Sequence, residues 1–392
     1  MRLMDRNLNI IAMDIPLPAN YGGVIDVYFK LKSLHALGVK VHLHVYEYGR
    51  SKDDDLLKVC ESVSYYPRRT TRQYLLHRKP YIVASRNSDR LINALCRNDY
   101  PILFEGLHTC YYLDHERLKD RVKIVRSHNV EHDYYRNLAS VERNVFKQIY
   151  FTREADKLER FENVLKHTTG IAAISKKDTE YLKTKFSNVE QISAFHPHEE
   201  VEIAQGNGDF CLYHGSLDVG ENNQAAMYLV EKVFSKCDHK LIIAGKKPSK
   251  ELQNAVALKS NIELMTNLDT EGIHDLIRDA QINVLPTFQA TGLKLKLLAA
   301  LYSGRHCLVN TPMIENTGLE QVCRIEGKAD SMISAINELM DVEMTESDKL
   351  ARKETLDQGF GNSSNAERLY EMIFGEKPEI KETSKIFGSN LL

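Results

Sequence analysis

The segment RSHNVEH, residues 126–132, places an arginine, two histidines, an asparagine and a glutamate at the end of a strand-like run. So many polar groups are costly in a plain core but useful beside a ligand. His128 can exchange a proton near neutral pH, and Arg126 can hold a negative charge. We therefore predict that His128 is catalytic and that Arg126, Asn129 and Glu131 contact a substrate.

A structural role for the same segment stays open. Asn129 is a good N-cap for a following helix, and His132 can face solvent. The chain holds 15 histidines, so one histidine after a strand is weak support by itself. The clustering of several polar residue types is what favours a functional site.

A second candidate follows a strand-like run that ends at Pro286. The segment TGLKLK, residues 291–296, indicates the start of a helix with Lys294 and Lys296 in its first turn. Lysines there oppose the helix dipole, at a cost of a few tenths to about 1 kcal/mol. The placement is understandable if a diphosphate binds Thr291, Gly292 and both ammonium groups. The alternative is a solvated lysine pair on a surface helix.

Three further loops offer weaker support for an anion site. Gly22 and Gly23 separate the first strand-like run from the first helix, and Gly215 follows the run DFCLYH. Glycines let the backbone approach a ligand, and a helix start presents free N–H groups. Lys246, after the run KLIIAG, would lie at the same edge of a sheet. Each of these loops also fits an ordinary turn.

Such loops meet only if a parallel sheet brings them together. Over the first 200 or so residues, apolar β-branched runs alternate with amphipathic helical stretches, the first of which Gly38 ends. A second series begins near Gly208. Its five apolar runs are DFCLYHG, KLIIAG, NIELMT, INVLP and HCLVN. This alternation predicts doubly wound α/β sheets, whose ligands lie beyond the carboxyl ends of the strands.

We therefore predict an α/β protein of two Rossmann-like domains facing each other across a cleft. Residues 1–198 form the first domain and residues 199–358 the second, because the polar segment 196–208 between the two series is typical of a linker. Residues 359–376 are expected to form a helix that crosses back to the first domain, and residues 377–392 a flexible tail.

Bulk composition excludes several classes of protein. A chain of 392 residues is too long for one ordinary core, and its net charge of −2 argues against a dedicated nucleic-acid binder. No run approaches the roughly 18 apolar residues of a membrane span, and the start lacks a secretory cleavage site. The seven cysteines are scattered, which favours reduced thiols over disulfides or a zinc site. We expect a cytoplasmic protein.

The order of these segments resembles that of the retaining GT-B glycosyltransferases over nearly the whole chain. The early glycine loop and HALGVKVHLHVYEY resemble their opening, and GIAAISKKDTEYL resembles the end of their first domain. The segments YHGSLDVGENNQAA, LIIAGKKPSKEL and FQATGLKLKLLAALYSGRHCLVNT resemble successive signatures of their second domain. The similarity is greatest to a branch found in Bacteroidetes cell-surface polysaccharide gene sets.

This resemblance implies a nucleotide-sugar donor held mainly by the second domain and a glycan or lipid-linked acceptor held mainly by the first. It also implies retention of configuration, no obligate metal and no cofactor besides the co-substrate. Arg126, Asn129 and Glu131 would then contact the acceptor or the sugar. The residues expected to bind the donor diphosphate are Gly22, Gly23, Gly215, Lys246, Thr291, Gly292, Lys294 and Lys296.

The chain departs from the family pattern in two respects. The family tends to place an Arg and a Lys just after the first strand of the second domain, where this chain has Ser216-Leu217 and Glu221-Asn222. The family's usual pair of glutamates is also missing. Gln289 and Ala299 stand where the family usually carries two glutamates, and we assign Gln289 to catalysis together with His128. The loss of both carboxylates leaves open a degenerate partner subunit without activity. A nucleotide-sugar epimerase is another alternative, with Glu105 and Glu131 as its acids. Peripheral contact with the inner face of the membrane also stays open.

Overall fold

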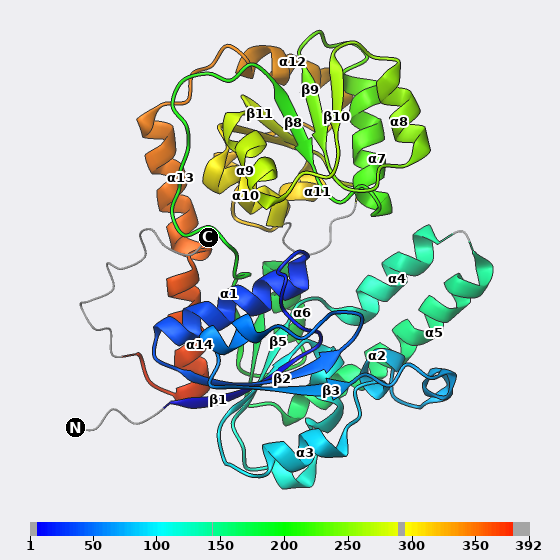
Figure 1. Ribbon diagram of the computed structural model, residues 1–392, viewed down its shortest axis with the longest axis vertical. Helices are drawn as coiled ribbons and strands as arrows, with labels where there is room; N and C mark the ends of the chain where they lie inside the picture. Colours follow the sequence, from blue (N-terminus) through cyan, green and yellow to red (C-terminus); the bar gives the residue numbers. More distant parts are fainter. Residues whose placement is uncertain (1–5, 143, 289–294, 379–392) are drawn as a thin grey trace. The chain divides into compact units, whose positions relative to one another are not determined.

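The computed structural model describes residues 6–142, 144–288 and 295–378, and these form two compact units. Unit 1 takes the chain up to Phe195 and again from Asn362, whereas unit 2 is the continuous segment His196–Gly361. The chain therefore leaves unit 1, builds unit 2 and then returns (Figure 1). None of the described helices combines the length and the apolar composition needed to cross a membrane.

Unit 1 is built on a seven-stranded parallel sheet with the order β3-β2-β1-β4-β5-β6-β7. The strands are β1 Asn7–Ala12, β2 Lys40–Glu47, β3 Ser62–Pro67, β4 Ile102–Glu105, β5 Lys123–Ser127, β6 Gly170–Ala173 and β7 Val189–Gln191. The strand order reverses between β1 and β4. In sheets of this kind, such a reversal leaves a crevice at the carboxyl ends of the strands, where ligands bind.

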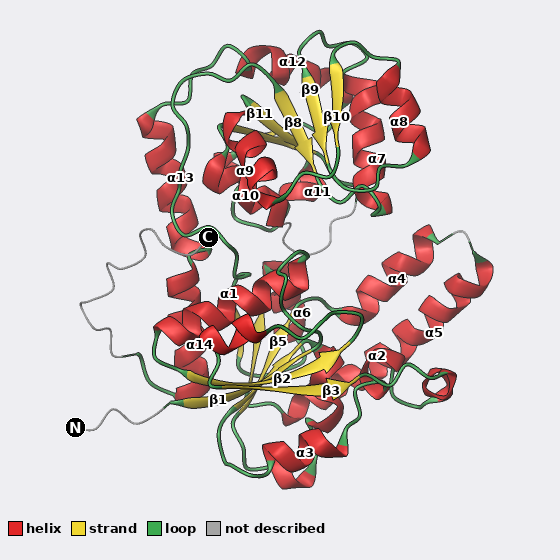
Figure 2. Cartoon of the chain, in the orientation of Figure 1, coloured by secondary structure: helices red, strands yellow, loops and turns green. Residues whose placement is uncertain are grey.

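Helices cover both faces of this sheet (Figure 2). They are α1 Gly22–Ala36, α2 Tyr81–Ala84, α3 Asp89–Leu95, α4 Glu131–Val141, α5 Val145–Glu162, α6 Lys176–Lys183 and α14 Asn362–Phe374. Side chains alternate along each strand, so one apolar cluster forms on each face. Leu8 and Ile10 of β1 pack with α1 and α14, whereas Ile11 packs with the cluster on the other face.

Unit 2 repeats the plan with a six-stranded parallel sheet of order β10-β9-β8-β11-β12-β13. Its strands are β8 Cys211–His214, β9 Leu241–Ala244, β10 Ile262–Met265, β11 Ile282–Leu285, β12 His306–Val309 and β13 Arg324–Ile325. Its helices are α7 Gly220–Tyr228, α8 Lys250–Ala257, α9 Thr270–Asp279, α10 Leu295–Ser303, α11 Thr311–Ile314, α12 Ala329–Leu339 and α13 Glu346–Gly359.

The predicted fold class, with two parallel α/β units of Rossmann type, is confirmed. Both sheets reverse their strand order after the third strand from one edge, between β1 and β4 in unit 1 and between β8 and β11 in unit 2. Each reversal gathers the loops that follow its central strands. Among the described residues that the sequence singled out, Gly22, Gly23, His128, Gly215 and Lys246 lie in such loops or next to them.

Candidate functional site

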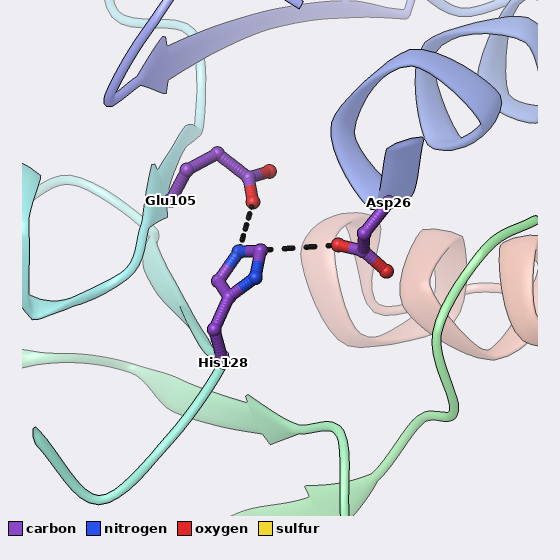
Figure 3. Close-up of side chains that lie close together, drawn as sticks. All are labelled: Asp26, Glu105 and His128. Atoms are coloured by element: carbon purple, nitrogen blue, oxygen red, sulfur yellow. Dashed lines mark hydrogen bonds and ion pairs between the residues drawn. The ribbon is translucent and has the colours of Figure 1, made fainter. Parts of the chain in front are cut away.

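The carboxyl edge of the sheet in unit 1 holds a histidine–carboxylate pair. Glu105 is the last residue of β4, and His128 follows the end of the neighbouring strand β5. The His128 Nε2 atom lies 3.0 Å from Glu105 Oε2 (Figure 3). The His128 side chain keeps 9% of its surface exposed, whereas Glu105 is fully buried. The pair therefore has one buried end and one accessible end.

Two buried cations hold this pair. Lys30 Nζ lies 2.8 Å from Glu105 Oε1 and 2.8 Å from Asp26 Oδ2. Arg126 Nη2 donates to Asp26 Oδ1 at 2.8 Å, and Asp26 Oδ2 lies 3.9 Å from His128 Nε2. The carboxylates of Asp26 and Glu105 thus face the buried side chains of Lys30 and Arg126.

The electrostatics of this cluster keep both carboxylates ionised. Burial alone would raise the pKa of Asp26, but Arg126 and Lys30 hold that pKa well below its usual range. Burial likewise opposes ionisation of Glu105, and Lys30 and then His128 lower its pKa. An ionised carboxylate only accepts hydrogen bonds, so His128 Nε2 must carry the proton that it shares with Glu105. The other ring nitrogen, Nδ1, makes no hydrogen bond to any described residue.

Asp26 and Lys30 belong to the site although the sequence did not single them out. They lie one turn apart on α1 and are 1% and 0% exposed. The available signal was an acid and a base at i and i+4 beside the apolar face of a helix. A surface ion pair has the same spacing, so only the packing of α1 on the sheet distinguishes the two cases.

Asp26, Glu105 and His128 could also be considered as metal ligands. One ligand atom from each lies within 4.8 Å of the others. However, the ammonium group of Lys30 lies between the two carboxylates, 2.8 Å from each of them. A divalent cation would have to share this space with a buried positive charge. Lys30 already provides the cation that these carboxylates require.

A second buried acid lies close to the pair. Glu131 is the first residue of α4, and its Oε1 atom is 3.7 Å from His108 Nδ1. Burial raises the pKa of Glu131 to about 8 and holds the pKa of His108 well below its usual range. Gly106 separates this group from His128, and its φ of +70° suits glycine. A methyl group there would lie 3.1 Å from His108 and 3.8 Å from His128.

The structural interpretation of segment 126–132 is wrong in two respects. Val130, not Asn129, is the N-cap residue of α4, and the Asn129 side chain instead hydrogen-bonds Glu131. His132 does not face solvent: it is 4% exposed, and its Nε2 atom lies 3.3 Å from the Tyr181 hydroxyl.

Arg126 requires a correction to the predicted substrate contacts. It is fully buried, and its guanidinium donates to Asp26 and to the carbonyl oxygens of Ile192 and Ser193. A side chain with no exposed surface cannot contact an acceptor. The predicted role for Arg126 as a substrate ligand is therefore withdrawn, and its observed role is to position Asp26.

The Gly22–Gly23 loop forms the start of α1, on the same edge as His128. Tyr21 is the N-cap residue, and its hydroxyl donates to Asp14 Oδ2 at 3.1 Å. Arg50 stacks on the Tyr21 ring and donates to Asn20. These contacts fix the exposed first turn of the helix, whose free N–H groups are suited to an anion.

The corresponding edge of unit 2 is organised around Lys296. Its Nζ atom lies 2.8 Å from Asn222 Oδ1 and 5.1 Å from the centre of the Tyr213 ring. The Tyr213 hydroxyl donates to the Asn222 carbonyl at 3.0 Å. Gly215 leaves room for this arrangement, because a Cβ there would lie 3.3 Å from the Asn222 side chain. Lys296 thus reaches the carboxyl end of β8 from α10.

The loop after β11 is fixed up to its last described residues. Asn310 accepts from Thr287 N at 3.0 Å and donates to Thr287 O at 2.7 Å, and Thr287 also hydrogen-bonds Glu221. Lys246 is exposed after β9. The predicted residues Gln289, Thr291, Gly292 and Lys294 lie outside the described residues, so their assignments stay predictions. The described part of α10 begins at Leu295.

A cavity of about 260 Å³ in unit 2 lies away from these residues. It opens beside β12, β13 and α13, and Cys307, Cys323 and Arg352 are among its lining residues. None of the predicted site residues that the structure describes lines it. The case for a site therefore rests on the polar clusters at the sheet edges.

Comparison with known proteins identifies the fold. No family model matches the sequence. The chain is 27% identical over 328 residues to an uncharacterized 44.6 kDa protein in the cps region of Klebsiella pneumoniae, covering 79% of this chain and 84% of that protein.

Solved structures share the architecture over nearly the whole chain. Each of the following matches 94% of this chain. WaaG, a glycosyltransferase involved in lipopolysaccharide biosynthesis, has a TM-score of 0.61 at 10% identity and is covered over 100% of its length. S. aureus TarM, in complex with UDP among other ligands, has a TM-score of 0.62 at 10% identity and is also covered over 100%. The E. coli protein described as "Trehalose-6-phosphate", bound with UDP-2-fluoro glucose, has a TM-score of 0.59 at 9% identity and is covered over 98%. At these identities the likeness establishes the GT-B fold.

Proposed function

We propose that this protein is a glycosyltransferase that moves a sugar from a nucleotide-sugar donor to a glycan or lipid-linked acceptor. The polar edge of unit 1, described above, is the observation that carries the proposal. The GT-B fold and the cps-region relative support a role in cell-surface polysaccharide synthesis. Retention of configuration, independence from metal and membership of a Bacteroidetes-type branch rest on the sequence resemblance.

His128 is the catalytic residue in this proposal. Glu105 accepts the Nε2 proton, which leaves Nδ1 as the nitrogen that can meet a hydroxyl group. A carboxylate that orients a histidine also stabilises the imidazolium form, as in other histidine–carboxylate pairs. Asp26, Lys30 and Arg126 are positioning residues that keep Glu105 ionised and fixed.

The donor diphosphate binds in unit 2 under this proposal. Lys296 and Lys294, together with the N-terminal end of α10, neutralise the charge that develops on the leaving group. Gly215 and Lys246 lie at the carboxyl ends of β8 and β9, two neighbouring strands of the same sheet. Gln289 keeps its predicted catalytic role in this scheme. Neighbours solved with UDP or a UDP-sugar make a nucleoside diphosphate the first ligand to test.

The acceptor binds at unit 1 through exposed parts of the His128 edge. Asn129 stays in the proposal because it follows His128 directly and is partly exposed. Glu131 was also predicted to contact the acceptor, but it is 4% exposed, so in this proposal it positions Asn129 through their hydrogen bond. The start of α1 at Gly22 and Gly23 offers N–H groups to a phosphate on either substrate.

The test separates binding from chemistry. UDP, GDP, ADP and dTDP are screened by thermal shift, because a ligand of the folded state raises the melting temperature. The release of nucleoside diphosphate is then measured with the matching nucleotide-sugars. His128→Ala should lower the release rate by about 10²–10⁴ fold, the usual contribution of acid–base catalysis. It should leave the thermal shift by the diphosphate unchanged.

His167→Ala is the matched control, because His167 is an exposed histidine of the same unit. Release at the wild-type rate by His128→Ala would contradict the catalytic assignment. A protein that binds none of the diphosphates would instead support the degenerate partner subunit. An epimerase would change the sugar without releasing diphosphate.

A further inference from the structure

Two arginines of unit 1 carry positive charges that no acid neutralises. Arg68 follows the end of β3, and Arg86 follows α2. Arg86 is only 4% exposed, and Arg68 is partly exposed. Neither side chain forms an ion pair with a described residue. A buried cation without an anion is costly, so an anionic ligand would remove a cost that the folded protein otherwise bears.

Backbone carbonyl groups hold Arg86 at the carboxyl edge of the sheet. Its Nε and Nη2 atoms donate to the carbonyl oxygen of Met13, the residue after β1, at 3.3 and 2.9 Å. Its Nη1 atom donates to the carbonyl oxygen of Ile82 at 2.6 Å. A guanidinium has five N–H groups, so one on each terminal nitrogen has no acceptor among the described residues. The carbonyl groups thus fix the side chain without cancelling its charge.

Arg68 is fixed beside Arg86. Its Nε atom donates to the hydroxyl of Ser85, the residue before Arg86, at 3.0 Å, and its guanidinium lies 4.2 Å from the centre of the Tyr48 ring. Its two terminal nitrogens have no acceptor among the described residues. Burial, and then the charge of Arg68, lower the pKa of Arg86 to about 9, which still leaves Arg86 charged at neutral pH. The two guanidinium groups are therefore close neighbours of like charge.

The arginine pair lies near His128. A Cβ atom at Gly106 would lie 3.4 Å from the Met13 side chain, 3.1 Å from His108 and 3.8 Å from His128. Met13 is the residue whose carbonyl oxygen holds Arg86. Burial, and then the charges of Arg86, His128 and the other arginine, hold the pKa of His108 well below its usual range. An anion on the arginines would therefore be bound next to the catalytic residue of the proposed function.

Two acids lie nearby without neutralising the pair. Asp14 accepts a hydrogen bond from the Tyr21 hydroxyl at 3.1 Å, and Arg50, which stacks on the Tyr21 ring, opposes its charge. Burial raises the pKa of Glu131 to about 8, so this carboxyl group is uncharged at neutral pH. Even with Asp14 counted as ionised, Arg50 balances it, and two positive charges remain.

This arrangement selects the class of ligand. Adjacent guanidinium groups match the oxygens of a phosphate, which offers several acceptors and up to two negative charges. A carboxylate has one negative charge and would leave one of the two cations without an anion.

We propose that the acceptor carries a phosphate group, which Arg68 and Arg86 bind beside His128. This inference deepens the proposed function and rests on it for the identity of the ligand as the acceptor. The binding of a phosphate here follows from the arginines themselves, so the two claims can fail separately.

The experiment is isothermal titration calorimetry of the full chain with inorganic phosphate. It uses the Lys294→Ala, Lys296→Ala protein as the background, because these changes remove the diphosphate site proposed in unit 2. Adding Arg68→Gln should weaken phosphate binding by about 10–100 fold, the effect of losing a hydrogen bond to a charged group. Arg68 is changed rather than Arg86, because the loss of Arg86 would leave two buried carbonyl groups without their donor.

Arg69→Gln is the matched control. Arg69 is the next residue, is exposed and donates to the Tyr74 hydroxyl at 3.1 Å. The same charge is lost there, and phosphate affinity should not change. Methyl phosphate and dimethyl phosphate then distinguish a terminal phosphate on the acceptor from a bridging one, since each would identify the source by binding more tightly than the other.

Three results would decide against one claim or the other. Equal phosphate affinity of the Arg68→Gln and Arg69→Gln proteins would overturn this inference, and diphosphate release by wild type would still support the proposed function. Acetate that binds as tightly as phosphate would overturn the assignment to a phosphate. Phosphate binding that depends on Arg68, in a protein that binds no nucleoside diphosphate, would support the phosphate site and contradict the proposed function.

Discussion

The burial of Glu131 makes the stability of the protein depend on pH. It occupies the first turn of α4, where the helix dipole favours a negative charge. Its neighbours nevertheless leave Oε1 without a hydrogen bond among the described residues, and burial raises its pKa to about 8. The effect of burial therefore exceeds that of the dipole. The group is expected to be protonated at neutral pH, next to an uncharged His108.

This pKa makes the contribution of Glu131 to stability depend on pH. The unfolded chain loses the proton near 4.5, whereas the folded protein keeps it up to about 8. The free energy of unfolding should therefore fall as the pH rises from 4.5 to 8, and then level off. Glu131→Gln should remove this loss, which amounts to roughly 2–5 kcal/mol at about 1.4 kcal/mol per pKa unit.

This pH dependence is checked by denaturant unfolding, which gives the free energy of unfolding of wild type and of Glu131→Gln at one pH below 4.5 and at one above 8. The variant should gain stability relative to wild type only at the higher pH. Glu180→Gln, which changes an exposed glutamate of the same unit, is the control and should show no such difference. An equal stability difference at both pH values would mean that Glu131 titrates normally.

At the scale of residues, the sequence pointed to part of the candidate site, whose function stays a prediction. His128 was predicted from its position after an apolar run, and the structure does place it at the sheet edge. Asp26 and Lys30 could not be predicted, because an acid and a base at positions i and i+4 have the same spacing in the sequence whether the pair is exposed or buried. Arg126 was misassigned for the related reason that sequence does not distinguish a buried guanidinium from an exposed one.

At the scale of elements, the proposed diphosphate site at the start of α10 can be tested by replacing its two lysines. Lys296 is the second described residue of the helix and is held by Asn222. Lys294→Ala combined with Lys296→Ala should reduce turnover by about 10²–10³ fold, the range found when one stabilising donor is removed. The thermal shift by a nucleoside diphosphate should shrink as well, because the proposed function assigns its binding to the same ammonium groups.

Lys250→Ala is the control for this pair, since Lys250 is an exposed lysine in the first turn of α8. It should leave both the turnover and the thermal shift unchanged. Near-normal turnover of the double variant, together with an unchanged thermal shift by the nucleoside diphosphate, would contradict the assignment of the diphosphate to this helix.

The central strands were predicted from the sequence, whereas of the four edge strands only β10 was, as the run NIELMT. The central strands β1, β4, β8 and β11 are buried along nearly their whole length, so they read as continuous apolar runs. The strands β3, β7 and β13 were not predicted. Each is an edge strand that is short or partly exposed, so it lacks such a run.

At the scale of the whole molecule, the return of the chain at Asn362 ties its end to unit 1. Leu369 of α14 is fully buried in the cluster that contains Leu8 and Ile10 of β1. Leu369→Ala should therefore destabilise unit 1 by about 2–5 kcal/mol, as core leucine deletions usually do. A helix over residues 359–376 that crosses back to the first domain was predicted, although its amphipathic pattern by itself does not identify the core that it joins.

Hydrogen exchange of individual amides measures this effect in each unit. Protection of β1 and β5 amides should fall in Leu369→Ala, whereas protection of β8 and β11 amides in unit 2 should not. Arg368→Ala, which changes a partly exposed neighbour 3.8 Å from Glu190, should have little effect on either unit. Equal loss of protection in both units would mean that they unfold together.

The discontinuity of unit 1 also has a consequence for how the protein is made. A ribosome delivers all of unit 2, residues 196–361, before it delivers α14. During that interval the nascent chain presents the uncovered apolar residues that α14 will later bury, among them Ile10 and Leu31. Unit 1 is therefore begun first and finished last. A chain released by termination before α14 would have a complete unit 2 and an exposed apolar face on unit 1.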